Sequence, residues 1–231
     1  MTVHGVLFDF SGTLFRIEST TSWLRTVLDR AGLRPEEAEF GRMERELREC
    51  GALPGGPAPR VVPEPLAAAW AQRDRSTEEH RAAYLGLARE ARLPKPELYE
   101  ALYARHMEPD AWLPYPDAAQ VLAELRRRGV PVGVVSNIGW DLRPVFRRHG
   151  LDRWVDAFVL SYEHQVQKPD PRLFRIGCDA LGVAPEQVLM VGDDARADGG
   201  AAALGCEVLL VDHLPVTERP DGLRPVLERL G

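Results

Sequence analysis

Two kinds of hydrophobic pattern divide this chain. Five short apolar runs, each followed by turn or polar residues, are typical of buried parallel strands: 5–8, 132–135, 157–160, 188–191 and 208–211. Between the later runs, apolar residues recur at helical spacing in four segments: 117–128, 141–149, 171–181 and 198–204. Strands that alternate with helices predict an α/β fold, in which a parallel sheet is covered by helices on both faces.

Residues 16–110 have a different character. They are rich in Arg, Glu and Ala, and their apolar residues mark helix faces: Trp23, Leu24, Val27 and Leu28, then Leu85, Leu87 and Ala88, then Leu98, Leu102 and Tyr103. This pattern predicts an insertion of about four helices, with Val61-Val62 as the only strand-like stretch. We therefore expect a core domain from residues 1–15 and 111–231, with a helical domain from 16–110.

Residues 51–59 form a loop rich in Pro and Gly within the insertion. Such composition predicts a connector between helices. The alternative is a specificity loop that faces the active site.

Composition and charge narrow the range of partners. The 231 residues carry a net charge of -6, which argues against nucleic acid because there is no basic surplus to neutralise phosphates. No run of 18 apolar residues predicts a membrane span. No basic and apolar leader precedes the first strand, and the three cysteines show no metal-ligand spacing. We therefore expect a cytoplasmic protein with reduced thiols.

The lysines and histidines differ in what they suggest. Only Lys95 and Lys168 are lysines among 29 basic residues, so each is a candidate for a site where a compact ammonium is needed. The six histidines show no ligand spacing, and we expect them to be structural or exposed.

Polar residues follow the predicted strands, and parallel sheets bind ligands beyond the carboxyl ends of their strands. The first strand leads to Asp9 and Ser11, and the next to Ser136 and Asn137. The loop after 157–160 carries Glu163 and Lys168, and the strand 188–191 leads to Asp193, Asp194 and Asp198. Four strand ends thus supply carboxylates, hydroxyls and an ammonium to one crevice.

These residues form four ordered motifs that resemble those of the haloacid dehalogenase superfamily. The motifs are Asp9-Phe-Ser-Gly-Thr, Ser136-Asn137, Lys168-Pro-Asp-Pro171 and Gly192-Asp-Asp-Ala-Arg-Ala-Asp198. The resemblance covers nearly the whole chain, because the helical insertion looks like the first type of cap in that superfamily. It implies a Rossmann-like core and a hydrolase, most often a phosphatase acting on a small phosphorylated substrate.

The resemblance also implies roles for individual residues. Asp9 would attack phosphorus and form an aspartyl-phosphate. Mg²⁺ would be bound by Asp9, the carbonyl of Ser11 and Asp193, with either Asp194 or Asp198 binding or orienting its waters. The substrate phosphoryl group would be bound by Ser136 and Lys168, together with Asn137, Gly12 and Thr13.

Ser11 departs from the pattern, because phosphatases of this superfamily usually carry a second aspartate there as general acid and base. One interpretation is a phosphatase for leaving groups that need little help, or one that borrows an acid from Glu18, His106 or His164. A second is other chemistry: a dehalogenase, or a phosphonatase-like enzyme with Lys95 as imine nucleophile. A third is a catalytically weak protein that binds a phosphorylated ligand or a protein partner.

Overall fold

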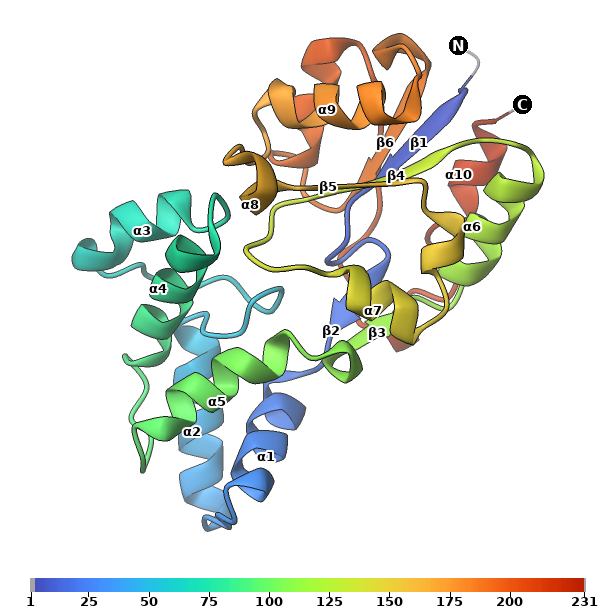
Figure 1. Ribbon diagram of the computed structural model, residues 1–231. Helices are drawn as coiled ribbons and strands as arrows, with labels where there is room; N and C mark the ends of the chain where they lie inside the picture. Colours follow the sequence, from blue (N-terminus) through green and yellow to red (C-terminus); the bar gives the residue numbers. More distant parts are fainter. Residues whose placement is uncertain (1–2, 231) are drawn as a thin grey trace.

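The computed structural model describes residues 3–230, and a five-stranded parallel sheet forms its centre (Figure 1). The strand order is β5-β4-β1-β6-β7, and every neighbouring pair is parallel. The strands are β1 (Gly5–Phe8), β4 (Val132–Ser136), β5 (Ala157–Leu160), β6 (Val188–Gly192) and β7 (Glu207–Leu210). All five predicted strands are confirmed, with ends that differ by one residue at most. The α/β Rossmann-like fold predicted from the sequence is therefore also confirmed.

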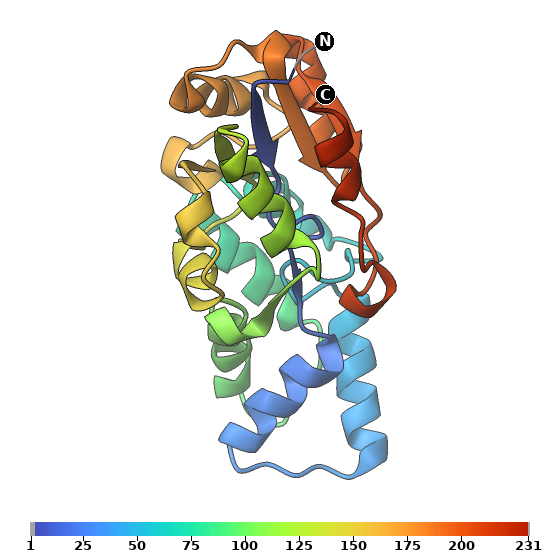
Figure 2. The same cartoon turned by 90° about the vertical axis from the view of Figure 1, so that its right-hand side faces the viewer.

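Helices cover both faces of the sheet (Figures 1 and 2). α9 (Pro171–Leu181) lies on one face, and α6 (Ala118–Arg127) and α10 (Arg224–Glu228) lie on the other. Alternate residues of β1 serve the two faces, because Leu7 packs in the cluster with α9 while Val6 and Phe8 pack in the larger cluster. Two short helices, α7 (Arg143–Arg148) and α8 (Ser161–His164), follow β4 and β5.

Some predicted helices differ from those observed. The segment 198–204 is a 3₁₀ helix, η5 (Asp198–Leu204), whose second and third residues are glycines, which have poor helix propensity. A Cβ on Gly200 would lie 2.3 Å from the carbonyl oxygen of Pro169, so the helix approaches that chain closely. The other 3₁₀ segments are η1 (Glu64–Leu66), η2 (Pro109–Ala111), η3 (Asp152–Trp154), η4 (Pro185–Gln187) and η6 (Val216–Glu218).

An insertion of helices lies beyond the carboxyl end of β1 (Figure 1). Its helices are α1 (Thr20–Arg30), α2 (Glu37–Glu49), α3 (Ala67–Gln72), α4 (Thr77–Ala88) and α5 (Glu97–His106). The two chain segments that lead into and out of it pair as a small antiparallel sheet, β2 (Phe15–Ile17) with β3 (Trp112–Pro114). These strands were not predicted, because three residues are too few to show an alternating pattern.

The predicted apolar helix faces are confirmed as buried in α1, α4 and α5. The insertion holds five α-helices where about four were expected, since the six-residue α3 is too short for a clear period. Val61-Val62 is not a strand, and Val61 is 76% exposed. The proposed domain boundaries near residues 15 and 111 fall beside the β2–β3 pair.

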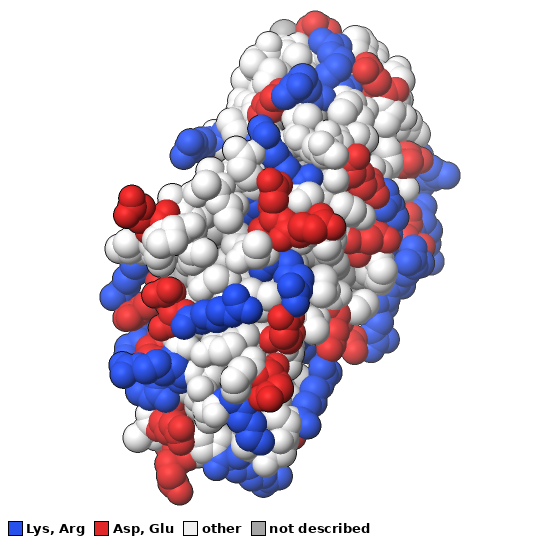
Figure 3. All heavy atoms as spheres, turned by 60° about the vertical axis from the view of Figure 1, so that its left-hand side comes forward, with Lys and Arg blue, Asp and Glu red and all other residues white. Residues whose placement is uncertain are grey.

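Charged side chains are spread over the surface. On the face drawn in Figure 3, basic and acidic side chains intermingle and do not gather into one large basic area. The exclusion of nucleic acid as a partner, which was inferred from the net charge, stays a prediction. Among residues 3–230, no helix combines the length and the apolar character needed to cross a bilayer.

Candidate active site

A cavity of about 260 Å³ lies between the carboxyl ends of the strands and the helical insertion. The core lines it with residues that follow β1, β4 and β6, and with Lys168. The insertion lines it with residues of the 51–59 loop, of α3 and α4, and of the turn between them. Most of the strand-end residues predicted from the sequence therefore share this cavity. Glu163 is the exception, because it is exposed, pairs with Arg143 at 2.8 Å and does not line the cavity.

Lys168 joins the ends of two strands. Its Nζ donates hydrogen bonds of 2.6 Å to Oδ1 of Asp9 and 2.6 Å to Oδ1 of Asp198. All three side chains are buried, with Lys168 4% exposed. Asn137 fixes the backbone of Lys168, because its side-chain amide donates to the Lys168 carbonyl (3.0 Å) and accepts from the Lys168 N–H (2.6 Å).

Burial and neighbouring charge shift the pKa values of this ion pair. Burial raises the pKa of Asp9 to about 8, and the carboxylates of Asp198 and Asp193 add to the rise while Lys168 opposes it. Burial acts to lower the pKa of Lys168, but Asp198 and Asp9 outweigh it, so this pKa is raised. Lys168 therefore stays protonated, and its single positive charge does not balance the carboxylates around it.

Asp193 completes a cluster of three carboxylates. One oxygen from each of Asp9, Asp193 and Asp198 lies within 4.8 Å of the others. The carboxylate of Asp198 lies against the end of β6, where a Cβ on Gly192 would come within 2.1 Å of it. Only glycine fits at position 192 without displacing Asp198.

Asp194 has a different position from Asp198. Its Oδ1 accepts hydrogen bonds from the N–H groups of Arg196 (2.8 Å) and Ala197 (2.9 Å), so it caps the turn that follows β6. The sequence left open which of the two acids belongs with Asp9 and Asp193. The geometry favours Asp198 for the cluster, and Asp194 for shaping the turn at the cavity wall.

Gly12 and Thr13 lie behind Asp193 and do not line the cavity. Thr13 is buried, and its hydroxyl donates to Oδ1 of Asp193 (3.3 Å). Gly12 has a φ of +84°, and a Cβ there would lie 2.3 Å from Oδ2 of Asp193. The sequence predicted that Gly12 and Thr13 contact the substrate. Their geometry instead supports a role in positioning Asp193. Ser136 and Ser11 do line the cavity, and Ser136 is buried.

Arg219 supports the same loop and was missed from the sequence. It is 4% exposed and donates to the carbonyl oxygens of Gly12 (2.6 Å), Thr13 and Asp212 (2.9 Å). Its guanidinium also stacks on the ring of Tyr115, 3.2 Å from the centroid. Arg219 is one of 27 arginines and lies far along the chain from the other site residues, so nothing in the sequence points to this role.

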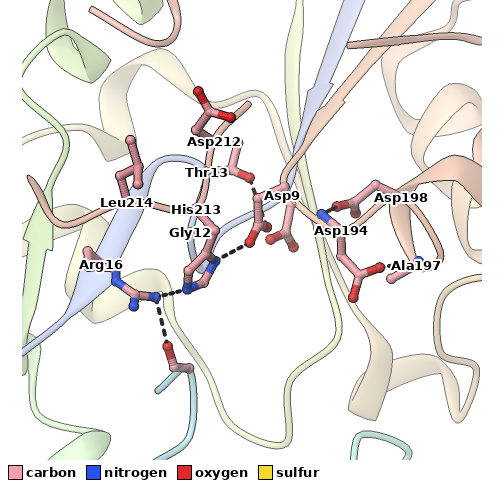
Figure 4. Close-up of polar contacts among 12 residues, drawn as sticks. Asp9, Gly12, Thr13, Arg16, Asp194, Ala197, Asp198, Asp212, His213 and Leu214 are labelled. Atoms are coloured by element: carbon pink, nitrogen blue, oxygen red, sulfur yellow. Dashed lines mark hydrogen bonds and ion pairs between the residues drawn. The ribbon is translucent and has the colours of Figure 1, made fainter. Parts of the chain in front are cut away.

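His213 lies beside Arg16 at the edge of the site (Figure 4), and its side chain is 40% exposed. Its ring contacts the carboxylate of Asp193 through Nδ1 and Arg16 through Nε2. Burial acts to raise the pKa of Asp193, but the His213 ring outweighs it and holds that pKa below its usual value. We expected histidines to be structural or exposed. His213 follows β7, so applying the strand-end rule to a fifth strand would have found it.

The 51–59 loop reaches the site, as the second interpretation of that segment required. Gly51 and Leu53–Ala58 line the cavity, and the Gly55 carbonyl accepts a hydrogen bond from Arg16 (3.2 Å). A Cβ on Gly55 would lie 2.8 Å from Oγ of Ser11. The loop therefore contacts the residue that departs from the superfamily pattern.

None of the three residues named as lenders of an acid lines the cavity. Glu18 pairs with Arg105 (2.6 Å), and His164 is exposed. His106 is buried, its Nδ1 contacts the Tyr103 carbonyl, and burial lowers its pKa to about 3. The lysine of the phosphonatase-like alternative, Lys95, is exposed in the loop before α5 and is also absent from the lining.

The family can now be assigned from comparisons with known proteins. A family model described as haloacid dehalogenase-like hydrolase matches residues 3–205. This chain belongs to the haloacid dehalogenase-like hydrolase family.

Relatives in this hydrolase family carry out different reactions. The chain is 41% identical to a phosphoserine phosphatase of Thermus thermophilus over 48% of this chain and 42% of that protein. It is 36% identical to (S)-2-haloacid dehalogenase 4A of Burkholderia cepacia over 43% of each chain. The chain thus spans less than half the length of these curated relatives.

A solved structure of the family shows the same fold. It is L-2-haloacid dehalogenase from Xanthobacter autotrophicus with chloropropionic acid covalently bound, at 24% identity and a TM-score of 0.62. The match covers 94% of this chain and 82% of that chain. The family and the fold are therefore established, and the choice between phosphate and halide chemistry depends on the site.

Proposed function

We propose that this hydrolase is a Mg²⁺-dependent phosphohydrolase that acts on a small phosphorylated metabolite. The observation that carries the proposal is the arrangement of Asp9, held by the Lys168 ammonium, within 4.8 Å of carboxylate oxygens of Asp193 and Asp198. A relative named phosphoserine phosphatase supports the same chemistry.

In the proposed reaction, a carboxylate oxygen of Asp9 attacks phosphorus. The bond from phosphorus to the leaving oxygen breaks, its electron pair stays on that oxygen, and an aspartyl-phosphate forms. Water then attacks the same phosphorus, which releases phosphate and restores Asp9. Lys168 keeps Asp9 oriented and places a positive charge near the phosphoryl oxygens, to which the Ser136 hydroxyl donates.

The residues of the carboxylate cluster fit a magnesium ion. Mg²⁺ prefers oxygen ligands, and Asp9, Asp193 and Asp198 offer carboxylate oxygens. Three carboxylates against the one ammonium of Lys168 leave an excess of negative charge, which a divalent cation would offset. Bound there, Mg²⁺ would reduce the repulsion between the Asp9 carboxylate and an anionic substrate.

The helical insertion would act as the cap of this site. Its residues close the cavity opposite Asp9, so they would exclude water during attack and contact the part of the substrate that leaves. The 51–59 loop, which contacts Ser11, would take part in substrate choice.

Dehalogenation is the second candidate, since a named (S)-2-haloacid dehalogenase is among the relatives. A halide leaves without a proton, so Ser11 in place of an acid suits this reaction. The carboxylate cluster opposes it, because three acids add negative charge to a site that would receive a carboxylate substrate. A binding protein with residual activity is a third outcome that the same assays detect.

One assay separates these functions. The proposal predicts that the purified chain hydrolyses an aryl phosphate with Mg²⁺ and loses this activity in excess EDTA, with recovery when Mg²⁺ is restored. Halide release from a 2-haloacid without added metal would favour the dehalogenase. Thermal stabilisation by phosphate plus Mg²⁺, without turnover of any ester, would favour the binding protein.

The substitution Ser11→Asp tests whether position 11 limits the rate. General acid–base assistance is worth ~10²–10⁴-fold, and leaving groups of high pKa need it most. If the missing acid at position 11 limits the rate, Ser11→Asp should raise kcat/KM for alkyl phosphates at least ~10-fold and change it much less for acyl phosphates; if another residue of the cavity supplies the proton, neither rate should rise.

Ser11→Asn is the matched control, because asparagine has the same shape as aspartate beside Gly55 but is not an acid. Equal effects of the Asp and Asn variants, or equal effects on both substrate classes, would show that acidity at position 11 does not limit turnover.

A further inference from the structure

The helical insertion places one carboxyl group in the cavity. Asp74 lies in the turn between α3 and α4, lines the cavity together with Asp9 and Ser11, and is 4% exposed. The other four cavity acids follow strands of the core. Of these, Asp9, Asp193 and Asp198 form the carboxylate cluster, and Asp194 caps its turn.

The Asp74 carboxyl has little holding it to the protein. Among residues 3–230, neither of its oxygens takes part in a hydrogen bond; its nearest charged contact is Nε of Arg73, 3.5 Å from Oδ2. The backbone is anchored instead, because the Asp74 carbonyl accepts a hydrogen bond from the hydroxyl of Ser161 in α8. The core thus fixes this turn at the cavity wall and leaves the carboxyl free for another partner.

Other titratable side chains of the cavity are poorly suited to exchange a proton. Nδ1 of His80 pairs with the Tyr103 hydroxyl at 2.9 Å, and burial holds the pKa of His80 well below its usual value. Burial raises the pKa of Tyr84 to about 12. Both ring nitrogens of His213 are engaged, by Asp193 and by Arg16.

We propose that Asp74 is the proton donor and acceptor that this chain uses in place of an acid at position 11. The inference rests on the proposed phosphohydrolase function. As the bond from phosphorus to the leaving oxygen breaks, that oxygen takes the Asp74 proton and departs as an alcohol. The Asp74 carboxylate then takes a proton from the water that attacks phosphorus, which restores the acid as phosphate is released.

The charges around Asp74 suit a carboxyl group that alternates between its protonated and ionised forms. Burial raises its pKa above the ordinary aspartate value, and Arg73 and Lys168 oppose the rise. Burial favours the protonated acid before the leaving group departs, and the two cations stabilise the carboxylate that results. Tyr84, the other titratable neighbour, acts on Asp74 only as a neutral phenol near pH 7.

The test is Asp74→Asn, assayed with Mg²⁺ on an alkyl phosphate and on an aryl phosphate with a good leaving group. We expect kcat/KM for the alkyl ester to fall ~10²–10³-fold, while kcat/KM for the aryl ester changes less than ~10-fold. In this variant the water that attacks the aspartyl-phosphate also lacks a general base. The variant should therefore release a burst of phenol equal in amount to the enzyme and then turn over slowly.

Three further variants give the test its controls. Glu78→Gln removes an exposed acid in the first turn of α4 and should leave both rates unchanged. Arg73→Gln keeps the acid and should retain the wild-type dependence on the leaving group. Ser11→Asp combined with Asp74→Asn should recover at least ~10-fold of the lost alkyl activity.

Equal losses on the two esters, with no burst and no recovery in the double variant, would overturn the inference and leave the phosphohydrolase intact. If the wild type hydrolyses neither ester with Mg²⁺, both proposals fail. Should Asp74→Asn not fold, the wild-type pH profile decides. As pH rises and Asp74 deprotonates, kcat/KM should fall for the alkyl ester before it falls for the aryl ester, whereas coincident profiles would contradict the role.

Discussion

Asp9→Asn should abolish hydrolysis of every phosphate ester that the wild type accepts. An amide oxygen is a poor nucleophile, and removal of a covalent nucleophile lowers kcat by on the order of 10⁴–10⁶-fold. The loss should be the same for alkyl, aryl and acyl phosphates, since each needs the attack by Asp9. Initial rates measured over a wide range of enzyme concentration would detect residual activity at this level.

The fold should survive the Asp9→Asn substitution. Burial and the repulsion from Asp198 and Asp193 outweigh the attraction of Lys168 at Asp9, and Lys168 keeps its second partner, Asp198. We therefore expect a Tm at least equal to that of the wild type in the absence of metal. Asp29→Asn, which changes an exposed acid in α1, is the control. Wild-type rates in Asp9→Asn would rule out Asp9 as the nucleophile.

Lys168→Met should lower both stability and activity. The substitution leaves Asp9 and Asp198 buried without their shared ammonium, and breaking a buried ion pair in this way costs ~3–5 kcal/mol in the free energy of unfolding. Loss of a fixed charge near the phosphoryl group should lower kcat by ~10²–10³-fold. Thermal melts and steady-state kinetics would measure the two effects.

Two other variants isolate the role of the Lys168 ammonium. Lys95→Met removes the only other lysine, which is exposed and does not line the cavity, and it should alter neither property. Lys168→Arg keeps the charge but is too bulky for the buried site, so it should restore little. Mg²⁺ should recover part of the Tm lost in Lys168→Met, because it offsets the same carboxylates. Wild-type stability in Lys168→Met would contradict the proposed ion pair.

The parallel sheet could be predicted from the sequence because its strands are buried on both faces. Each strand is then a continuous apolar run, and the polar residue that ends it marks the site. The positions of Asp9, Ser136 and Asp193 around one cavity follow from this rule. The choice between Asp194 and Asp198 did not, because it depends on which acid caps the turn after β6.

Residues outside the strand ends could not be predicted. Arg219 and Asp74 reach the site from remote segments, and only tertiary packing brings Arg219 to the Gly12 carbonyl and Asp74 to the cavity. The acids suggested from the sequence, Glu18 among them, were chosen by residue type without knowledge of which helix faces the cavity. The short strands β2 and β3 were missed because neither has a pattern of its own.

Trapping of the covalent intermediate tests the central claim most directly. The wild type would be mixed with Mg²⁺ and an excess of a ³²P-labelled aryl phosphate, quenched in acid during turnover, digested and analysed by mass spectrometry. We predict a labelled acyl-phosphate on the peptide that contains Asp9, and no label in Asp9→Asn. Release of phosphate at the same rate with no labelled protein, or a label on any other residue, would contradict the account.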